Sequence, residues 1–274
     1  MTINCKGKLI DLTTPKVMGI LNLTPDSFYD GGKYQDESGV FLQVEKMLTE
    51  GATFIDVGAY SSRPGAKHIS EEEELQRIVP IVKKLITKFP HILLSIDTFR
   101  SKVAKQCIEA GAALINDISA GEMDEKMMQT AGDLNVPYIM MHMNGTPQNM
   151  QQNPIYNNVT QEVLYYFSEK LVLARSFGIN DVIIDPGFGF GKTNVHNYQL
   201  LNELELFKNI ELPLLIGLSR KSMIYKTLNS DAQNALNGTT SLNTISLFKG
   251  ANILRVHDAK EAMECITLTQ NLTT

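Results

Sequence analysis

The sequence predicts a (β/α)8 barrel, and two observations carry this prediction. Short apolar runs rich in Ile, Leu, Val and Met occur eight times, and each run ends in a polar residue. Each run is followed by a loop and then by a segment with helical spacing of its apolar residues. Such runs are typical of parallel strands buried on both faces, and their alternation with helices indicates crossover units. Eight units in a chain of 274 residues fit one barrel domain covering residues 1–274.

The expected elements follow one another along the whole chain. The strands are expected at residues 17–22, 54–56, 92–97, 114–117, 138–142, 182–185, 214–219 and 253–257. Helical spacing covers residues 36–50, 70–88, 100–110, 123–134, 158–178, 196–208, 239–249 and 259–270. In the second helical segment we expect Ser70 to be the N-cap and the acidic run Glu71–Glu74 to be a solvated first turn.

Composition and charge exclude several classes of function. The net charge of −5 offers no electrostatic footprint for nucleic acid or for an anionic membrane. No apolar run approaches the roughly 18–20 residues of a membrane span, and no signal peptide is recognisable. The three cysteines are far apart and lack metal-ligand spacing, so we expect reduced thiols in a cytoplasmic protein.

The loop after the first strand carries oxygen ligands suited to a hard cation. Asn22 ends the strand, and Asp30 lies just before a Gly-Gly pair that punctuates the loop. Amide and carboxylate oxygens are ligands that Mg²⁺ prefers, with substrate phosphate filling much of the coordination shell. A solvated surface turn, with Asn22 only capping the strand, is the alternative.

Polar and charged groups also follow the next strands. Arg63 precedes Pro64, which fixes one backbone dihedral and helps to present the guanidinium to a carboxylate or phosphate; an ordinary surface arginine is the alternative. Asp97 and Asn116 end the third and fourth strands, and Asp185 ends the sixth. A carboxylate there can accept two parallel hydrogen bonds from adjacent N–H groups of a heterocycle.

The segment after Asp185 imitates a phosphate-binding loop without being one. Gly191-Lys192-Thr193 has the terminal triplet, but the first glycine of the motif would fall at Pro186. We interpret it as a tight, flexible loop that lays Phe188 or Phe190 over a flat ligand.

The last two strands indicate an anion site. Strand seven leads into Ser219–Ser222, where basic residues precede an expected helix start. Arg255 and His257 are two residues apart on the last strand, so they project to the same face and form a cationic pair suited to pyrophosphate. His142 on the fifth strand is better explained as a satisfied buried histidine.

Together these segments resemble the dihydropteroate synthase family. The matching motifs occur in the family's order between residues 17 and 260 and are Asn22–Phe28, Ser62–Gly65, Ile96–Thr98, Asn116-Asp117, Met141–Met143 with Gly145–Pro147, Asp185–Phe190, Ser219–Ser222 and Arg255–Asp258. Any one motif is weak, whereas eight in register are a specific signal. The family is a (β/α)8 barrel that joins 4-aminobenzoate to a pterin pyrophosphate on the folate pathway.

The resemblance implies three adjoining subsites, a Mg²⁺ ion and a homodimer. For the pterin it implies Asp97, Asn116, Ile118, Met140, Asp185, Phe190, Gly217 and Lys221. For the pyrophosphate it implies Asn22, Arg63, Arg255 and His257, with Asn22 binding the metal. For 4-aminobenzoate it implies Phe28, Ser62, Pro64, Phe190, Lys221 and Ser222. The catalytic groups by the same resemblance are Asp30, Arg63, Lys221, Arg255 and His257.

The second loop departs from the family pattern. Many members have Gly-Glu-Ser-Thr before Arg-Pro-Gly, where this chain has Ala59-Tyr60-Ser61-Ser62. Serine for threonine keeps the hydroxyl and drops a methyl group, which can loosen the aminobenzoate pocket. Tyr60 for glutamate puts in doubt only the fine structure of the loop.

Two other functions fit a pterin-binding barrel. A corrinoid-dependent methyltransferase domain shares the barrel and the pterin carboxylates, but it does not need Arg63 or the Arg255–His257 anion site. A catalytically silent carrier or regulator would need neither those groups nor Asn22 and Lys221. Turnover of 4-aminobenzoate with pterin pyrophosphate, releasing pyrophosphate, separates the three.

Overall fold

Eight parallel strands form a closed barrel in this computed structural model, which describes residues 1–23, 37–62 and 68–273. The strands are β3 (Lys16–Asn22), β4 (Phe54–Gly58), β5 (Leu94–Asp97), β6 (Leu114–Asp117), β7 (Tyr138–Met141), β8 (Val182–Asp185), β9 (Leu215–Ile216) and β10 (Ile253–Val256). Their order around the sheet is β8-β7-β6-β5-β4-β3-β10-β9, and a parallel bridge between Ile184 and Leu214 joins the two ends. The predicted (β/α)8 barrel is therefore confirmed.

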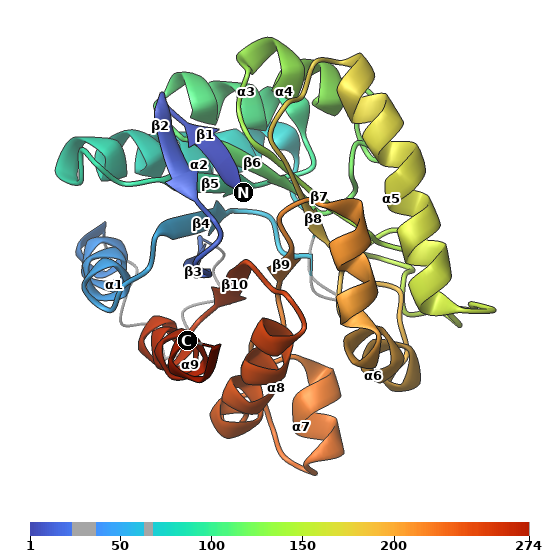
Figure 1. The fold of residues 1–274 in the computed structure, drawn as a ribbon. Helices are drawn as coiled ribbons and strands as arrows, with labels where there is room; N and C mark the ends of the chain where they lie inside the picture. The colour runs from blue at the N-terminus through green and yellow to red at the C-terminus, as the bar shows by residue number, and fades with distance from the viewer. Residues whose placement is uncertain (24–36, 63–67, 274) are drawn as a thin grey trace.

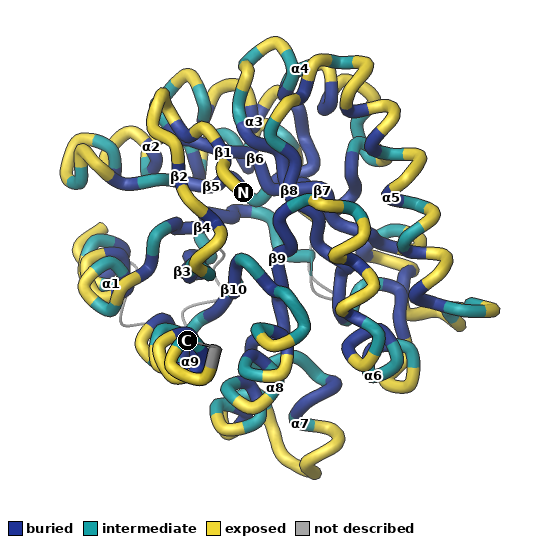
Figure 2. Tube along the Cα trace, in the orientation of Figure 1, coloured by how far each residue is buried: buried dark blue, intermediate teal, exposed yellow. Residues whose placement is uncertain are grey.

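Helices surround the barrel on its outside (Figure 1). They are α1 (Glu37–Thr49), α2 (Glu71–Lys88), α3 (Ser101–Glu109), α4 (Met127–Leu134), α5 (Val159–Ser176), α6 (Asn194–Asn202), α7 (Ser222–Thr227), α8 (Leu236–Phe248) and α9 (Ala259–Thr273), with a 3-10 helix η1 (Leu204–Ile210). The helical segment expected at 196–208 is thus divided between α6 and η1. The outward faces of the helices are exposed and the strands are buried (Figure 2). Among the described residues, no helix is long and apolar enough to cross a membrane.

The start of α2 confirms one expectation and corrects another. Ser70 is the N-cap, and its side chain accepts a hydrogen bond from the backbone N–H of Glu73. Glu74, however, is fully buried and forms an ion pair with Arg100. Its other oxygen accepts a hydrogen bond from the Thr98 hydroxyl at 2.7 Å. The expectation of a solvated acidic turn is wrong for Glu74, because the arginine that covers it lies 26 residues further on.

A β-hairpin that the apolar runs do not predict closes one end of the barrel. Its strands β1 (Thr2–Cys5) and β2 (Lys8–Asp11) pair antiparallel and lie across the ring of barrel strands (Figure 1). Ile3 and Ile10 pack in one buried cluster with residues from the first halves of the barrel strands, such as Phe54. The hairpin therefore plugs the amino-terminal end, and ligands have access to the carboxyl-terminal end.

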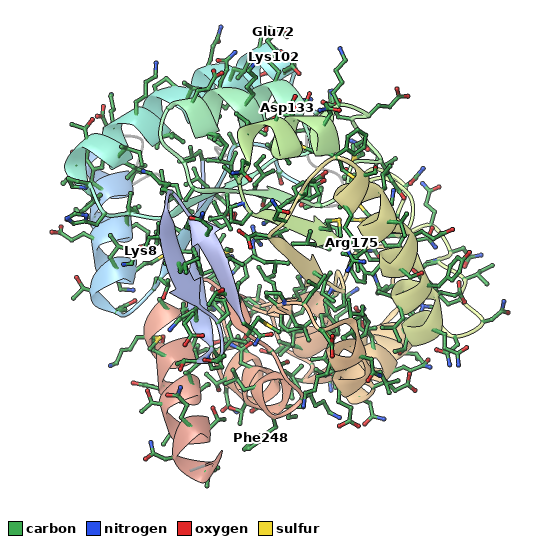
Figure 3. All side chains as sticks on the ribbon, turned by 45° about the horizontal axis from the view of Figure 1, so that its top comes forward. Lys8, Glu72, Lys102, Asp133, Arg175 and Phe248 are labelled. Carbon is green, nitrogen blue, oxygen red and sulfur yellow. The ribbon has the colours of Figure 1, made fainter. Side chains whose placement is uncertain are left out.

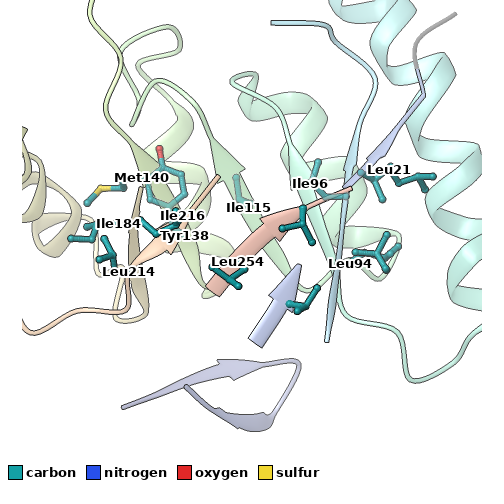
Figure 4. Close-up of a cluster of buried hydrophobic side chains, with 14 of the residues drawn as sticks. Leu21, Leu94, Ile96, Ile115, Tyr138, Met140, Ile184, Leu214, Ile216 and Leu254 are labelled. Carbon is teal, nitrogen blue, oxygen red and sulfur yellow. The ribbon is translucent and has the colours of Figure 1, made fainter. Parts of the chain in front are cut away.

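Alternation along each strand separates an outer apolar layer from the barrel interior. The outer side chains, drawn in Figure 4, include Ile96, Ile115 and Ile184, which pack in the same cluster as the buried faces of the helices. Because successive strand residues point to opposite faces, their neighbours Asp97, Asn116 and Asp185 face the interior. The polar residues predicted at the strand ends thus line the mouth of the barrel.

Candidate functional site

The mouth of the barrel brings four strand ends to one level. Asn22 pairs in register with Gly58, Gly58 with Asp97, and Asp97 with Asn116. A side chain at position 58 would come within 3.4 Å of the Asp97 carboxylate, so glycine leaves that carboxylate room. Asp97 and Asn116, expected from the sequence to meet a ligand, therefore lie side by side.

Arg255 connects Asp97 to a second acid, Asp56, deeper in the barrel. Its Nε donates to Oδ2 of Asp56 at 2.6 Å, and its Nη2 donates to Oδ2 of Asp97 at 2.7 Å. Burial alone would lower the pKa of Arg255, but the two carboxylates raise it above its ordinary value. Burial raises the pKa of Asp97, which Arg255 opposes and Asp56 reinforces. The guanidinium thus holds the carboxylates of Asp56 and Asp97 together through charged hydrogen bonds.

Asp56 also orients Asn116. The amide Nδ2 of Asn116 donates to Oδ2 of Asp56 at 3.0 Å, so its oxygen is left to accept a hydrogen bond from a ligand. Asp56 is fully buried, and its Oδ1 has no hydrogen-bond partner within the described chain. Asp56 ends the strand expected at residues 54–56 but has no predicted role; its position directly after the apolar pair Phe54-Ile55 was the available signal.

Asp185 and Lys221 stand on either side of a glycine. One oxygen of Asp185 accepts from the backbone N–H of Gly187 at 2.8 Å, and burial raises the pKa of this acid. Burial lowers the pKa of Lys221 to about 8, and the nearby Asp185 limits that fall. A side chain at position 217 would come within 3.9 Å of the Lys221 Nζ and 4.0 Å of the Asp185 Oδ2. Gly217 therefore keeps the space between the two charges open.

The apolar wall of the mouth contains Met141 instead of the predicted Met140. Met140 is fully buried in the outer layer, beside Ile184 and Tyr138 (Figure 4). Met141 has the opposite orientation and clusters with Ile118, against which Phe190 packs. The prediction of Met140 is wrong by one residue, which on a strand means the opposite face.

Phe190, and not Phe188, is the aromatic residue of the sixth strand's loop that faces the mouth. Phe188 is fully buried in the outer core, whereas Phe190 is half-buried. The Nζ of Lys221 lies over the Phe190 ring, 4.8 Å from the ring centroid. Lys221 also donates a hydrogen bond to the Phe188 carbonyl. The side chains of Phe190 and Lys221 are thereby held together.

His257 and Lys221 remain in the expected anion site, and Arg220 does not. The Nδ1 of His257 lies 2.9 Å from the Ser219 hydroxyl, at the ends of two neighbouring strands. Arg220 makes a two-fold hydrogen bond with the Asp258 carboxylate, at 2.8 Å for each nitrogen. Because its guanidinium is engaged there, Arg220 fixes the β9 loop to the end of β10.

Two of the remaining predicted residues, Ser62 and Ser222, lie within the described part of the chain. Ser62 and Ser222 are partly exposed, and Ser222 begins α7. Phe28, Asp30, Arg63 and Pro64 lie outside the described residues. His142 is buried as expected, with its Nδ1 2.8 Å from the ammonium of Lys192.

A surface hollow of about 550 Å³ lies away from the strand-end acids, between α5 and the segment that follows β7. Tyr156, Tyr165 and Tyr166 line it together with three glutamates. It contains none of the mouth residues described above except His142, so the convergent acids and cations of the mouth identify the candidate site.

The family model for pterin-binding enzymes matches residues 18–257. Dihydropteroate synthase of Escherichia coli K12 is 41% identical over 272 residues, covering 98% of this chain and 96% of that protein. The Haemophilus influenzae enzyme of the same name is 43% identical, with 98% of each chain covered.

Solved structures of dihydropteroate synthases also superpose closely with this chain. A Yersinia pestis dihydropteroate synthase in complex with a sulfonamide drug superposes with a TM-score of 0.95 at 41% identity, covering 100% of this chain and 99% of that one. The Xanthomonas albilineans enzyme in complex with 7,8-dihydropteroate superposes with a TM-score of 0.87 at 30% identity, covering 100% and 98%.

Proposed function

The chain belongs to the dihydropteroate synthases, transferases of folate biosynthesis, and we propose how the mouth of its barrel carries out their reaction. In this reaction the amine of 4-aminobenzoate attacks the methylene carbon of a dihydropterin pyrophosphate. The new C–N bond replaces the C–O bond to pyrophosphate, and the amine loses one proton. The division of the mouth into three subsites is our proposal.

The pterin lies between the acceptor groups on one side of the mouth and the apolar wall on the other. The 2-amino-4-oxo ring presents adjacent N–H donors, which Asp185 and the free oxygen of Asn116 can accept. Phe190, Met141 and Ile118 supply the surface for the flat ring. The open space at Gly217 places the ring edge between Asp185 and Lys221.

The pyrophosphate lies beside Arg255 and His257, together with Arg63 by family resemblance. An aromatic amine is uncharged at neutral pH, so it needs positioning more than deprotonation. The main catalytic effect is then stabilisation of the negative charge that grows on the departing pyrophosphate. Arg255 is close enough to Lys221 to lower its pKa, and we propose that both cations act on the charge of the leaving group. Asp30 completes the catalytic set by resemblance only.

The 4-aminobenzoate lies against Phe190, Lys221 and Ser222, and family resemblance adds Phe28, Ser62 and Pro64 to its pocket. The partly exposed Ser62 and Ser222 and the position of Phe190 beside Lys221 support this subsite. The hydroxyl of Ser222 at the start of α7 is suited to the carboxylate of 4-aminobenzoate.

Mg²⁺ fits the oxygen donors at the end of β3. The side chain of Asn22 is partly exposed, and within the described residues it makes no hydrogen bond that would occupy its amide oxygen. Mg²⁺ binds through one or two protein oxygens together with phosphate oxygens, so one amide is sufficient on the protein side. The ion would neutralise charge on the leaving pyrophosphate. Calorimetry of pyrophosphate with Mg²⁺ should show weaker binding to Asn22→Ala than to the parent protein.

The convergence of Asp97, Asn116, Asp185 and Arg255 in the mouth of the barrel is the observation that carries this proposal. We expect Asn116→Ala to weaken binding of 6-hydroxymethylpterin by about tenfold, because a buried donor of the ligand loses its acceptor. Exposed Asn157→Ala is the control. Pterin affinity that is equal in the two variants would remove Asn116 from the site.

We propose further that the protein is a homodimer of the cytoplasm. Exposed apolar side chains gather on the last helices, with Ile245 and Phe248 on α8 and Leu268 and Leu272 on α9. Figure 3 shows Phe248 projecting from the surface of α8. A second copy would cover these residues, and light scattering of Phe248→Asp against the parent protein tests it. The three cysteines are unpaired and buried, in accord with a reducing compartment.

A further inference from the structure

Lys192 is a buried cation that the proposed reaction does not use. Its side chain is 2% exposed, and none of the ion pairs among the described residues includes it. The sequence marked it only as part of a failed phosphate-loop motif. Burial lowers its pKa to about 7, and the charge of Asp185 limits the fall. A cation kept in such a place is costly unless its N–H groups are all engaged.

The ammonium of Lys192 is engaged by the loop that follows β8 and by the end of β7. It donates to the carbonyls of Gly187 at 3.0 Å and Phe190 at 3.2 Å, which are the two ends of one turn. The backbone N–H of Phe190 donates to the Gly187 carbonyl at 3.1 Å, and this hydrogen bond closes the same turn. The third partner is His142, whose Nδ1 lies at 2.8 Å.

His142 is the matching acceptor in this arrangement. Burial, and the charge of Lys192 next to it, lower the pKa of His142 to about 2, so the ring is neutral. Its Nδ1 therefore accepts a hydrogen bond from the ammonium of Lys192. The backbone approaches closely here as well, since a side chain at Gly187, where φ is +70°, would come within 1.9 Å of the His142 carbonyl.

Other side chains bind the remaining carbonyls of the loop. Lys221 donates to the Phe188 carbonyl, Gln151 to that of Gly189 at 2.6 Å and Tyr156 to that of Gly191 at 2.9 Å. Gln151 and its bond are exposed, and Tyr156 binds beyond Phe190. Lys192 alone among these four donors holds both ends of the turn that carries Phe190.

We propose that Lys192 is a positioning residue for the pterin: its ammonium fixes the turn Gly187–Phe190 against His142 and so sets Phe190 and Asp185 for the ring. The inference rests on the proposed pterin subsite. Lys192 acts on Asp185 through Gly187. The N–H of Gly187 donates to the Asp185 carboxylate, and the carbonyl of Gly187 accepts from Lys192. Phe190 is reached directly through its carbonyl. Lys192 itself is shielded from the ligand by this turn.

The deciding measurement is calorimetry of 6-hydroxymethylpterin with Lys192→Met. Loss of a charged hydrogen-bond donor shared by two carbonyls should weaken pterin binding by about tenfold or more. Inorganic pyrophosphate with Mg²⁺ should bind as to the parent protein. In turnover, KM for the pterin substrate should rise while kcat stays within about threefold, because charge stabilisation at the leaving group is untouched.

Two control variants separate positioning from general loosening of the loop. Tyr156→Phe removes a hydrogen bond to Gly191 in the same loop, and exposed Lys105→Met removes an unrelated lysine. Both should bind pterin as the parent protein does. Normal pterin affinity in a folded Lys192→Met protein would overturn the proposal, as would an equal loss in Tyr156→Phe.

A pair of His142 variants decides the question if Lys192→Met does not fold. His142→Asn retains an acceptor oxygen near the position of Nδ1 and should keep pterin affinity, whereas His142→Leu removes the acceptor and should weaken it severalfold. Equal affinity of both variants and the parent protein would contradict the proposal. A parent protein that fails to bind pterin would instead refute the pterin subsite itself.

Discussion

Arg255 donates from Nε to the Asp56 carboxylate over 2.6 Å, at the level just below the acids that are expected to meet the pterin. The second arm of the same guanidinium reaches Asp97. Spacing along the strand assigns Arg255 to the pyrophosphate alone. These contacts also make Arg255 a structural partner of Asp56 and of Asp97, which is expected to bind the pterin. The proposed pterin and pyrophosphate subsites would therefore share one cation.

Arg255→Ala should lower both stability and function. Removing one partner of a buried ion pair leaves an uncompensated charge, which costs roughly 3–5 kcal/mol of unfolding free energy. Pyrophosphate affinity and turnover should fall more than tenfold, since a charged hydrogen bond contributes about 1.5–3 kcal/mol. Affinity for bare pterin should fall as well, because Asp97 would lose the guanidinium that holds its carboxylate in place. Urea unfolding and calorimetry measure these effects.

Arg255→Lys is the matched control. A lysine keeps the charge but lacks the two-armed fork, so it can bind only one of the two carboxylates well. Its pyrophosphate affinity should lie between those of the parent and alanine proteins. If Arg255→Ala retains the parent's unfolding free energy, the ion pair has no structural role.

Asp185→Asn should weaken pterin binding by about tenfold or more while leaving the melting temperature nearly unchanged. One carboxylate oxygen already accepts from Gly187, and the asparagine oxygen can keep that bond. The amide NH₂ then replaces the oxygen that faces the donors of the ring. Asp181→Asn, at the other end of the same barrel segment, is the control; its carboxylate accepts from the Asn4 N–H in the amino-terminal hairpin. Pterin calorimetry that fails to separate the two variants would remove Asp185 from the site.

The sequence predicts the strand-end acids well for a simple physical reason. An acid directly after an apolar run marks the carboxyl end of a buried strand, and parallel strands have those ends at one edge. Asp97, Asn116 and Asp185 were found in this way. Pairing across the barrel is not local, however, so the roles of Asp56 and Lys192 become visible only when β10 and the end of β7 are in place.

Errors of the sequence prediction arise where one residue decides the face or where a distant segment provides cover. Met140 and Met141 are both apolar, so the sequence does not distinguish them, yet only Met141 faces the mouth. Glu74 has the local environment of a solvated helix start, and Arg100 buries it from outside. The sequence gives Tyr60 no partner, and in the structure its ring meets that of Phe99 edge-on, with the ring centroids 5.0 Å apart, while its hydroxyl accepts from Gln148.

Binding of 4-aminobenzoate should depend on pyrophosphate. The loops expected to complete its pocket, at residues 24–34 and 59–68, carry the glycines and prolines that permit rearrangement above an anion site. We expect weak binding to the protein alone and much tighter binding with pyrophosphate and Mg²⁺ present. Calorimetry under the two conditions measures the difference, and equal affinities would show that the pocket forms without the anion.

The pH dependence of kcat/KM for the pterin substrate should report Lys221. Burial lowers the pKa of this lysine to about 8, so its charge is present at neutral pH and is lost as pH rises through that value. We propose that this charge stabilises the departing pyrophosphate, and we therefore expect kcat/KM to decline on the alkaline side.

The titration of Lys221 should not lower the stability of the folded protein while kcat/KM declines. Between about pH 8 and the lysine's ordinary value of 10.5 the unfolded chain binds the proton and the folded chain does not. The contribution of Lys221 to the unfolding free energy therefore rises with pH in this range. A parallel fall of activity and of the melting temperature would point to unfolding as the cause.

The variant Lys221→Arg tests whether Lys221 causes the alkaline decline, because the shape of its pH profile, and not the size of its kcat/KM, gives the answer. A guanidinium stays protonated throughout the accessible range, so the alkaline decline should move to higher pH or vanish. The rate itself should be lower, because the larger side chain disturbs the bond to the Phe188 carbonyl and the contact with Phe190. A variant whose decline stays near pH 8 would mean that another group titrates there and that the charge of Lys221 does not act on the leaving group.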